Sequence, residues 1–409
     1  MAWRRALLLA LSGCGGQSEH DGAVTAPDVP LGPCSELVLR ASPRVVMSTA
    51  SGSASGPVVL QRDGGFDVIA QFSGERDASL PTIQARRVSL VDGRSELKLG
   101  PLTKIGNSAS GWTEAVTLEA GLGLCTTSTV AVIGTAEAGG YQPDWTASPG
   151  ETSGACTGIV PLNGSLLTAM RSRVDDGSVG TVTTWSQGVL ESERTPWPAP
   201  GGLDADVSLA PLTDGYASAA ALDHGARIEV ELPGQGDGPE RTTIDWEFGE
   251  MRQPELAAWP EAPGAVAAVW RELEGDPTGS TGFPYQAFEL RMAVVAPTEG
   301  LLLGPTTLAS SALAGTPASL GSVDGKLLVA SLVQPDAASD ELEVVLRLLD
   351  ERGETMNAFS TAARDASGVY PGAAVAALDR HVLLAWTASQ PGDATYRWTE
   401  VHAALLECR

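Results

Sequence analysis

Short apolar runs broken by Gly, Pro, Asp and Asn follow one another along almost the whole chain after residue 34. Helical periodicity is scarce. The best candidate helix is the stretch 341–353, but the β-branched pair Val344-Val345 favours an alternating strand that ends in a turn. The pattern therefore predicts an all-β protein.

Six segments share a hairpin pattern, in which an extended run, a turn and a second apolar run follow each other. Asn-Gly and Asp-Gly between apolar runs are strong hairpin signals, because a type I′ turn needs positive φ at both central residues. The second run is nearly continuous in apolar residues, as expected for a strand buried on both faces. The predicted turns lie at Asp63-Gly64-Gly65, Asn163-Gly164, Asp214-Gly215, Gly264, Asp324-Gly325 and Asp379-Arg380.

From residue 164 onward these turns recur every 50 to 60 residues or so, with about four strand-like runs in each interval. A period near 50 with four strands is typical of a propeller blade. We therefore predict a β-propeller of seven four-stranded blades. The expected blades are 57–105, 111–150, 155–200, 204–250, 252–308, 314–365 and 368–408.

Two segments need separate treatment. The interval 106–155 fits the repeat poorly, so we expect an irregular blade with a loop held by a disulfide. Residues 34–47 alternate like a strand but have no hairpin of their own, and we place them as the missing strand of the last blade, which would close the ring. The alternative fold is a pair of β-sandwich domains that divide near 200–204.

The N-terminal residues have a different character. Arg4 and Arg5 precede the apolar run 6–11, which is too short for a membrane span of about 20 residues, and Leu11-Ser12-Gly13-Cys14 follows. This string resembles the bacterial lipobox, whose cysteine is lipidated and becomes the first residue of the mature chain. The resemblance implies a lipoprotein signal peptide at 1–13, and residues 14–33, rich in Gly, Pro and acidic residues, are expected to be a flexible tether before the folded domain at 34–409.

The same resemblance implies an address in the bacterial cell envelope. Fatty acyl chains such as palmitate on Cys14 would anchor the protein in a membrane. Gly15 is not the Asp that many inner-membrane lipoproteins carry after the lipidated cysteine, so the outer membrane is expected. A net charge of −24 disfavours nucleic acid and anionic headgroups, which leaves the lipid on Cys14 as the membrane contact.

Four cysteines remain after Cys14. Export to an oxidising compartment favours disulfides, and of the three possible pairings we favour Cys34 with Cys408 and Cys125 with Cys156. Free buried thiols are the alternative. A metal site is disfavoured because no CxxC or HxxxH spacing occurs, and no cofactor is expected.

No catalytic motif survives inspection. GSASG at 52–56 has Ala where a nucleophile elbow needs Ser, and GETSG at 150–154 has Thr in that place. Asp175-Asp176-Gly177 lacks the ladder of a calcium loop and is read as a hairpin turn. The four histidines are scattered and are read as structural or surface residues; they are His20, His224, His381 and His402.

The tryptophans divide into two groups. Trp270 and Trp386 end apolar strands and are expected to pack between blades. The others considered lie in predicted loops or outer strands, where exposed rings could bind carbohydrate or a partner protein. They are Trp112, Trp145, Trp185, Trp197, Trp246 and Trp259.

These observations favour a lipid-anchored, non-enzymatic binding module or scaffold with a protein or carbohydrate partner. The alternative is a lipid-anchored glycoside hydrolase, or another carbohydrate-active enzyme, that uses Asp or Glu. Such an enzyme would need two carboxylates about 5–10 Å apart, and we expect them beside an exposed Trp or Tyr.

Overall fold

The computed structural model describes residues 32–49, 53–73, 81–91, 96–107, 114–119, 121–126, 129–135, 141–148, 155–174, 177–197, 207–222, 225–234, 239–245, 249–274, 288–311, 318–334, 342–363, 372–389 and 399–409. The chain divides into two units, Met1–Gly32 and Pro33–Arg409. Nearly all of the first unit lies outside the described residues, and with it Cys14 and the predicted tether. In the described part, no helix is long and apolar enough to cross a membrane.

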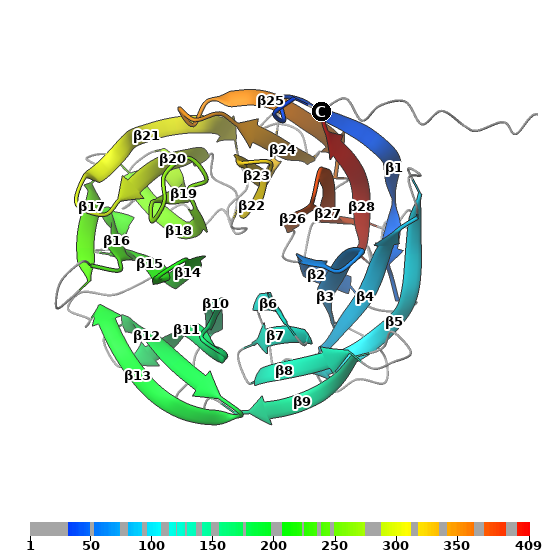
Figure 1. Cartoon of the computed structure of the whole chain (residues 1–409), viewed down its shortest axis with the longest axis horizontal. Helices are drawn as coiled ribbons and strands as arrows, with labels where there is room; N and C mark the ends of the chain where they lie inside the picture. The colour runs from blue at the N-terminus through cyan, green and yellow to red at the C-terminus, as the bar shows by residue number, and fades with distance from the viewer. Residues whose placement is uncertain are drawn as a thin grey trace, which may run out of the picture. The chain divides into compact units, whose positions relative to one another are not determined.

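Pro33–Arg409 forms seven four-stranded antiparallel sheets around a central axis, which confirms the predicted propeller (Figure 1). Blade 1 contains β2 (Ser53–Arg62), β3 (Gly65–Ser73), β4 (Thr82–Leu90) and β5 (Leu97–Asn107). Blade 2 contains β6 (Glu114–Leu118), β7 (Gly121–Cys125), β8 (Val130–Thr135) and β9 (Tyr141–Ala147). Blade 3 contains β10 (Ala155–Leu162), β11 (Ser165–Val174), β12 (Gly177–Ser186) and β13 (Val189–Trp197).

Blade 4 contains β14 (Val207–Leu212), β15 (Gly215–Leu222), β16 (Arg227–Leu232) and β17 (Glu240–Asp245). Blade 5 contains β18 (Gly249–Ala258), β19 (Val266–Glu274), β20 (Phe288–Ala296) and β21 (Gly300–Ser311). Blade 6 contains β22 (Ser319–Val323), β23 (Lys326–Val333), β24 (Glu343–Leu349) and β25 (Thr355–Ala362). Blade 7 contains β26 (Ala373–Leu378), β27 (His381–Ser389), β28 (Thr399–Cys408) and, as its outer strand, β1 (Leu37–Met47).

The ring closes between its first and last strands. β1 pairs antiparallel with β28, and Leu37 lies opposite Cys408. Beside them Cys34 is disulfide-bonded to Cys408, with a Cα–Cα distance of 5.4 Å. The prediction that residues 34–47 complete the last blade is confirmed, and the pair of β-sandwich domains is wrong.

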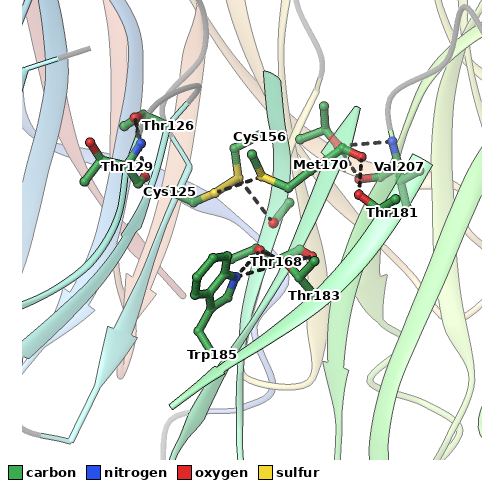
Figure 2. The surroundings of a disulfide bond; sticks show 12 residues. Cys125, Thr126, Thr129, Cys156, Thr168, Met170, Thr181, Thr183, Trp185 and Val207 are labelled. Atoms are coloured by element: carbon green, nitrogen blue, oxygen red, sulfur yellow. Dashed lines mark hydrogen bonds between the residues drawn. A yellow bond between two sulfur atoms is a disulfide. The ribbon is translucent and has the colours of Figure 1, made fainter. Parts of the chain in front are cut away.

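Blade 2 corrects the expectation of an irregular blade with a loop held by a disulfide. The interval 106–155 holds a regular sheet, whose outer strand β9 was missed because Tyr141–Ala147 is mainly polar or exposed. Cys125 ends β7 and is bonded to Cys156 in β10, so this disulfide joins blade 2 to blade 3 (Figure 2). Each cysteine is fully buried.

The core lies between neighbouring blades, because the second strand of a blade is covered on both faces. Eight of the nine residues of β3 are buried, as the nearly continuous apolar runs predicted. Trp270 packs in a cluster with residues of blade 4, and Trp386 packs in a cluster with residues of blade 6. The prediction that these two rings pack between blades is confirmed.

At one end of the ring, which we call the turn face, the first strand of each blade connects to the second. In blades 1 to 6 the third strand also connects to the fourth at this end, whereas in blade 7 the fourth strand is β1, which comes from the start of the propeller. Asn163 and Gly164 have φ of 48° and 83°, as a type I′ turn requires. Neighbouring blades contact each other here, since Arg380 Nη2 lies 2.8 Å from Asp324 Oδ2 and Lys326 Nζ lies 2.8 Å from Glu261 Oε1.

Candidate functional site

A cavity of about 240 Å³ lies among the innermost strands, at the axis of the propeller. Five blades contribute to it through β2, β6, β18, β22 and β26, which surround the axis in Figure 1. Its charged side chains are Glu114 and Glu255. Aliphatic side chains and polar backbone groups share the rest of the lining, and the aliphatic residues include Val58, Leu60, Leu256, Leu320 and Val375.

Bulges shape two of the strands that line this cavity. The pairing of β2 with β3 shifts between Ser55 and Val58, so Gly56 and Pro57 are left out of the ladder. Proline is tolerated at such a bulge because its missing N–H is not needed there. Gly56 has a φ of 49°, in the left-handed region that glycine adopts without strain.

The backbone of blade 7 comes close to this bulge. A Cβ on Gly372 would lie 2.9 Å from Pro57 Cδ and 3.3 Å from Gly56 Cα. Any side chain at position 372 would therefore push β26 away from β2 and alter the cavity wall. Glycine here is a requirement of the close approach between blades 1 and 7.

A second bulge in β18 sets the position of Glu255. The pairing with β19 shifts between Arg252 and Glu255, which leaves Gln253 and Pro254 out of the ladder. Bulges re-aim the side chains beside them. The Ser208 hydroxyl, buried in blade 4, is 3.4 Å from Glu255 Oε2 and accepts a hydrogen bond from the Leu256 N–H at 3.1 Å.

Glu114 is the first residue of β6 and lies opposite Cys125 of the neighbouring strand β7. It is half-buried, as is Glu255. Two carboxylates from blades 2 and 5 thus line one cavity, although the sequence analysis singled out neither. Acidic residues are too abundant in this chain for any pair to stand out, and no motif surrounds these two.

The chemistry of the lining favours a particular kind of ligand. Carboxylates in a partly apolar site attract a positive charge, since burial strengthens the interaction. The aliphatic wall suits an unbranched hydrocarbon chain. The lining residues that the structure describes include no Trp or Tyr. The exposed aromatic ring that we expected beside the two carboxylates of a glycoside hydrolase is therefore not among them.

Other buried carboxylates hold blades together. Asp67 in β3 is fully buried and contacts Arg62 Nη1 at 3.1 Å and Arg87 Nη1 at 3.3 Å. The Tyr141 hydroxyl of blade 2 donates to Asp67 Oδ1 at 2.6 Å. Burial, reinforced by the negative charge of Asp67, raises the pKa of Tyr141 above its ordinary value, so the phenol stays protonated as a donor.

A similar cluster joins blades 3 and 4. Glu231 is buried, and its two carboxylate oxygens contact Arg194 Nη2 at 2.5 Å and Arg241 Nη2 at 3.0 Å. Arg194 also donates to the Tyr216 hydroxyl at 2.8 Å. Both clusters pair a buried carboxylate with two arginines and connect to a tyrosine, so a structural role accounts for them.

The prediction of exposed tryptophan rings in loops and outer strands is partly wrong. Trp185 and Trp259 are each only 4% exposed, and Trp145 is half-buried against the cluster around the Cys125–Cys156 disulfide. Figure 2 shows Trp185 beside that disulfide, with its Nε1 donating to the hydroxyls of Thr168 and Thr183. The positions of Trp112 and Trp246 and the side chain of Trp197 lie outside the described residues.

The histidines that can be placed lie in blade 7. His381 begins β27, and His402 Nε2 lies 2.8 Å from Glu400 Oε1. His20 and His224 lie outside the described residues. In the part of the chain that the structure describes, no group of three or more His, Cys, Asp or Glu is placed to hold a metal ion.

The sequence motifs take ordinary places in the fold. Ser53–Gly56 of GSASG lies within β2 with Ala54 buried, so it forms part of a strand and no nucleophile elbow. GETSG and the pair Asp175-Asp176 lie outside the described residues, while the flanking Val174 and Gly177 pair as a tight hairpin requires.

Comparison with known proteins assigns no family. No family model matches the chain, and no curated protein matches its sequence. Among solved structures, the chain is similar to the subtype N11 neuraminidase-like protein of A/flat-faced bat/Peru/033/2010 (H18N11), with a TM-score of 0.41 and 8% identity over 92% of this chain and 96% of that one. It is also similar to a subtype N10 neuraminidase-like protein of A/little yellow-shouldered bat/Guatemala/060/2010, with a TM-score of 0.41 and 9% identity over 91% and 99% of the two chains.

Proposed function

We propose that this chain is a lipid-anchored protein of the bacterial cell envelope whose propeller is a non-enzymatic binding module. The observation that carries the binding role is the axial cavity, which five blades line with two carboxylates and an aliphatic wall. The anchor is proposed from Leu11-Ser12-Gly13-Cys14, with the lipid on Cys14 and the outer membrane as the destination.

The ligand class follows from the lining. A primary amine or guanidinium on an aliphatic chain would place its charge near Glu114 or Glu255 and its hydrocarbon against Val58 and Leu320. The net charge of −24 would raise the local concentration of such cations. A basic side chain of a partner protein has the same chemistry, so a protein partner remains within the proposal.

Isothermal titration with 1,5-diaminopentane tests the ligand class, and 1,5-pentanediol serves as the uncharged control. We expect saturable heat with the diamine alone, and its loss in Glu114→Gln and Glu255→Gln. Glu351→Gln, at an exposed turn in blade 6, is the matched control and should bind as the parent does. Equal heats with diamine and diol, or binding unchanged in both cavity variants, would contradict the assignment.

Anchoring is tested separately by Cys14→Ser. The parent should partition into the membrane fraction and carry acyl chains by mass spectrometry, and the variant should be released into the soluble fraction. A variant that stays with the membrane would refute the lipid anchor. Pull-down of the lipidated parent from its native membranes would then identify a protein or carbohydrate partner.

The second candidate is a lipid-anchored glycoside hydrolase. Its supporting observation is the same pair, because glycoside hydrolysis uses two carboxylates in one site. Hydrolysis of a glycoside panel that disappears in Glu114→Gln and Glu255→Gln, but persists in Glu351→Gln, would select this candidate over the binding module.

A further inference from the structure

Exposed large apolar side chains gather at one end of the propeller. Among the described residues seven such side chains are at least 37% exposed, and six of them belong to the part of an outer strand that adjoins the turn face. We call these six the apolar rim. They are Leu39, Val189, Leu190, Leu301, Leu302 and Met356.

Strand direction places the rim. In each antiparallel blade the fourth strand leaves the turn face, so the first residues of β13, β21 and β25 lie at that end. β1 runs the same way, because it is antiparallel to β28 and begins opposite Cys408. Leu39 therefore lies near the turn face, whereas the seventh exposed side chain, Val45, lies toward the opposite end of β1.

The chain also enters the propeller at the turn face. The Cys34 N–H donates to Asp324 Oδ2 at 2.9 Å, within the turn between β22 and β23. The disulfide to Cys408 holds the same point, and the Cys408 N–H donates to the Arg380 carbonyl in the turn between β26 and β27. The segment that precedes Cys34 is thus attached at the end that carries the apolar rim.

The length of that segment limits how far the rim can move from its anchor. A flexible linker of about 20 residues, the number from Cys14 to Pro33, would have a root-mean-square extent near 25 Å. A lipid on Cys14 would then keep the turn face at about that average distance from the bilayer, so even weak contacts would form at a high effective concentration.

We propose that the apolar rim rests on the surface of the lipid bilayer in which Cys14 is anchored. The inference rests on the proposed lipid anchor. Six apolar side chains distributed over the outer strands of blades 3, 5, 6 and 7 at one end of a ring suit a flat partner. The bilayer is that partner because the chain leading to Cys14 leaves from the same end.

The orientation has a consequence for the axial cavity. Ala318–Leu320 and Gly372–Val375 line the cavity at the start of β22 and β26, at the end of the ring away from the turn face. With the rim on the bilayer, this part of the cavity is directed away from the membrane. A ligand would therefore approach from the aqueous side.

The test uses the full lipidated chain in phosphatidylcholine vesicles. The four other cysteines are disulfide-bonded and Cys14 is acylated, so one added cysteine can be labelled with an environment-sensitive nitrobenzoxadiazole probe. Leu302→Cys places the probe on the rim, and Val45→Cys is the matched control at the opposite end. We expect a blue shift and quenching by shallow spin-labelled lipid at position 302, and neither at position 45.

A second variant separates docking from anchoring. Leu301→Glu in the Leu302→Cys chain should remove the blue shift and the quenching, while the protein still floats with the vesicles. Floating protein with equal emission at positions 302 and 45 would overturn the docking and leave the anchor intact. Protein that fails to float would overturn both the docking and the proposed anchor.

Discussion

The buried Asp67 cluster offers the sharpest test of how neighbouring blades are held together. Asp67→Ala removes the carboxylate that Arg62, Arg87 and Tyr141 share, at a site with no solvent exposure. The two guanidinium groups and the phenol hydroxyl would then lose their common acceptor. We expect a large loss of stability, because a charge left buried without its partner is costly.

The magnitude follows from the exposure of the partners. Breaking a buried ion pair costs about 3–5 kcal/mol, and the lower end applies here because Arg62 and Arg87 are 17% and 22% exposed and can turn toward water. Unfolding entropy of about 2.1 cal/mol/K per residue gives ~0.8 kcal/mol per degree for a unit the size of Pro33–Arg409. Asp67→Ala should therefore lower Tm by about 4 °C.

Differential scanning calorimetry at neutral pH measures this shift. Asp67→Asn keeps an acceptor for Tyr141 and should lower Tm by less. Glu351→Ala is the control, because that carboxylate lies at an exposed turn, and its Tm should match the parent. If Asp67→Ala melts with the parent and with Glu351→Ala, the cluster does not stabilise the junction of blades 1 and 2 and the reasoning fails.

Replacing Cys34 and Cys408 by Ser opens a loop of 374 residues in the unfolded chain, which loop-entropy models value at about 6 kcal/mol. A free energy of unfolding unchanged from the parent would refute ring closure as a source of stability. The raised pKa of Tyr141 means that the folded state keeps its proton as the unfolded phenol loses it near pH ~10, so stability should fall as pH rises above that value. Tyr141→Phe should flatten the fall in denaturation curves across this range, and an equally steep fall would contradict the assignment. Gly65→Ala should destabilise by about 1–3 kcal/mol because its Cβ would meet the Val88 carbonyl, whereas Gly304→Ala has open space and should melt as the parent does; equal melting of both would count against the tight packing.

Much of the fold follows from local sequence. Asn163-Gly164 and Asp324-Gly325 have positive φ at both residues, and the spacing of the whole series of predicted turns revealed the blade repeat. The closing strand was predictable because residues 34–47 alternate without a partner nearby. The turn at Gln187-Gly188 also has positive φ at both residues and was missed, because Gln is not a residue that signals such a turn.

The candidate site could not be predicted from local sequence patterns. Glu114 and Glu255 are 141 positions apart in the sequence, and only closure of the ring brings their strands to one cavity. The burial of Trp259 was hidden for a related reason. The sequence around Trp259 predicts a loop, but the backbone N–H of Trp259 donates to the Ala265 carbonyl and its ring packs against the core between blades 5 and 6. Lipidation of Cys14 stays a prediction.

The pairing of β1 with β28 also sets an order of events during folding. β1 precedes all the other described strands in the sequence and its partner β28 follows them, so the contact that completes blade 7 can form only after the strands of the other six blades have been synthesised. Contacts so distant in sequence form slowly, because the entropy of loop closure is lost before they can stabilise anything. Until then β1 and β28 each present an unpaired edge, and these edges could pair with another copy of the chain. A chain of this design would depend most on assistance late in folding, when six blades have formed and the seventh is still open.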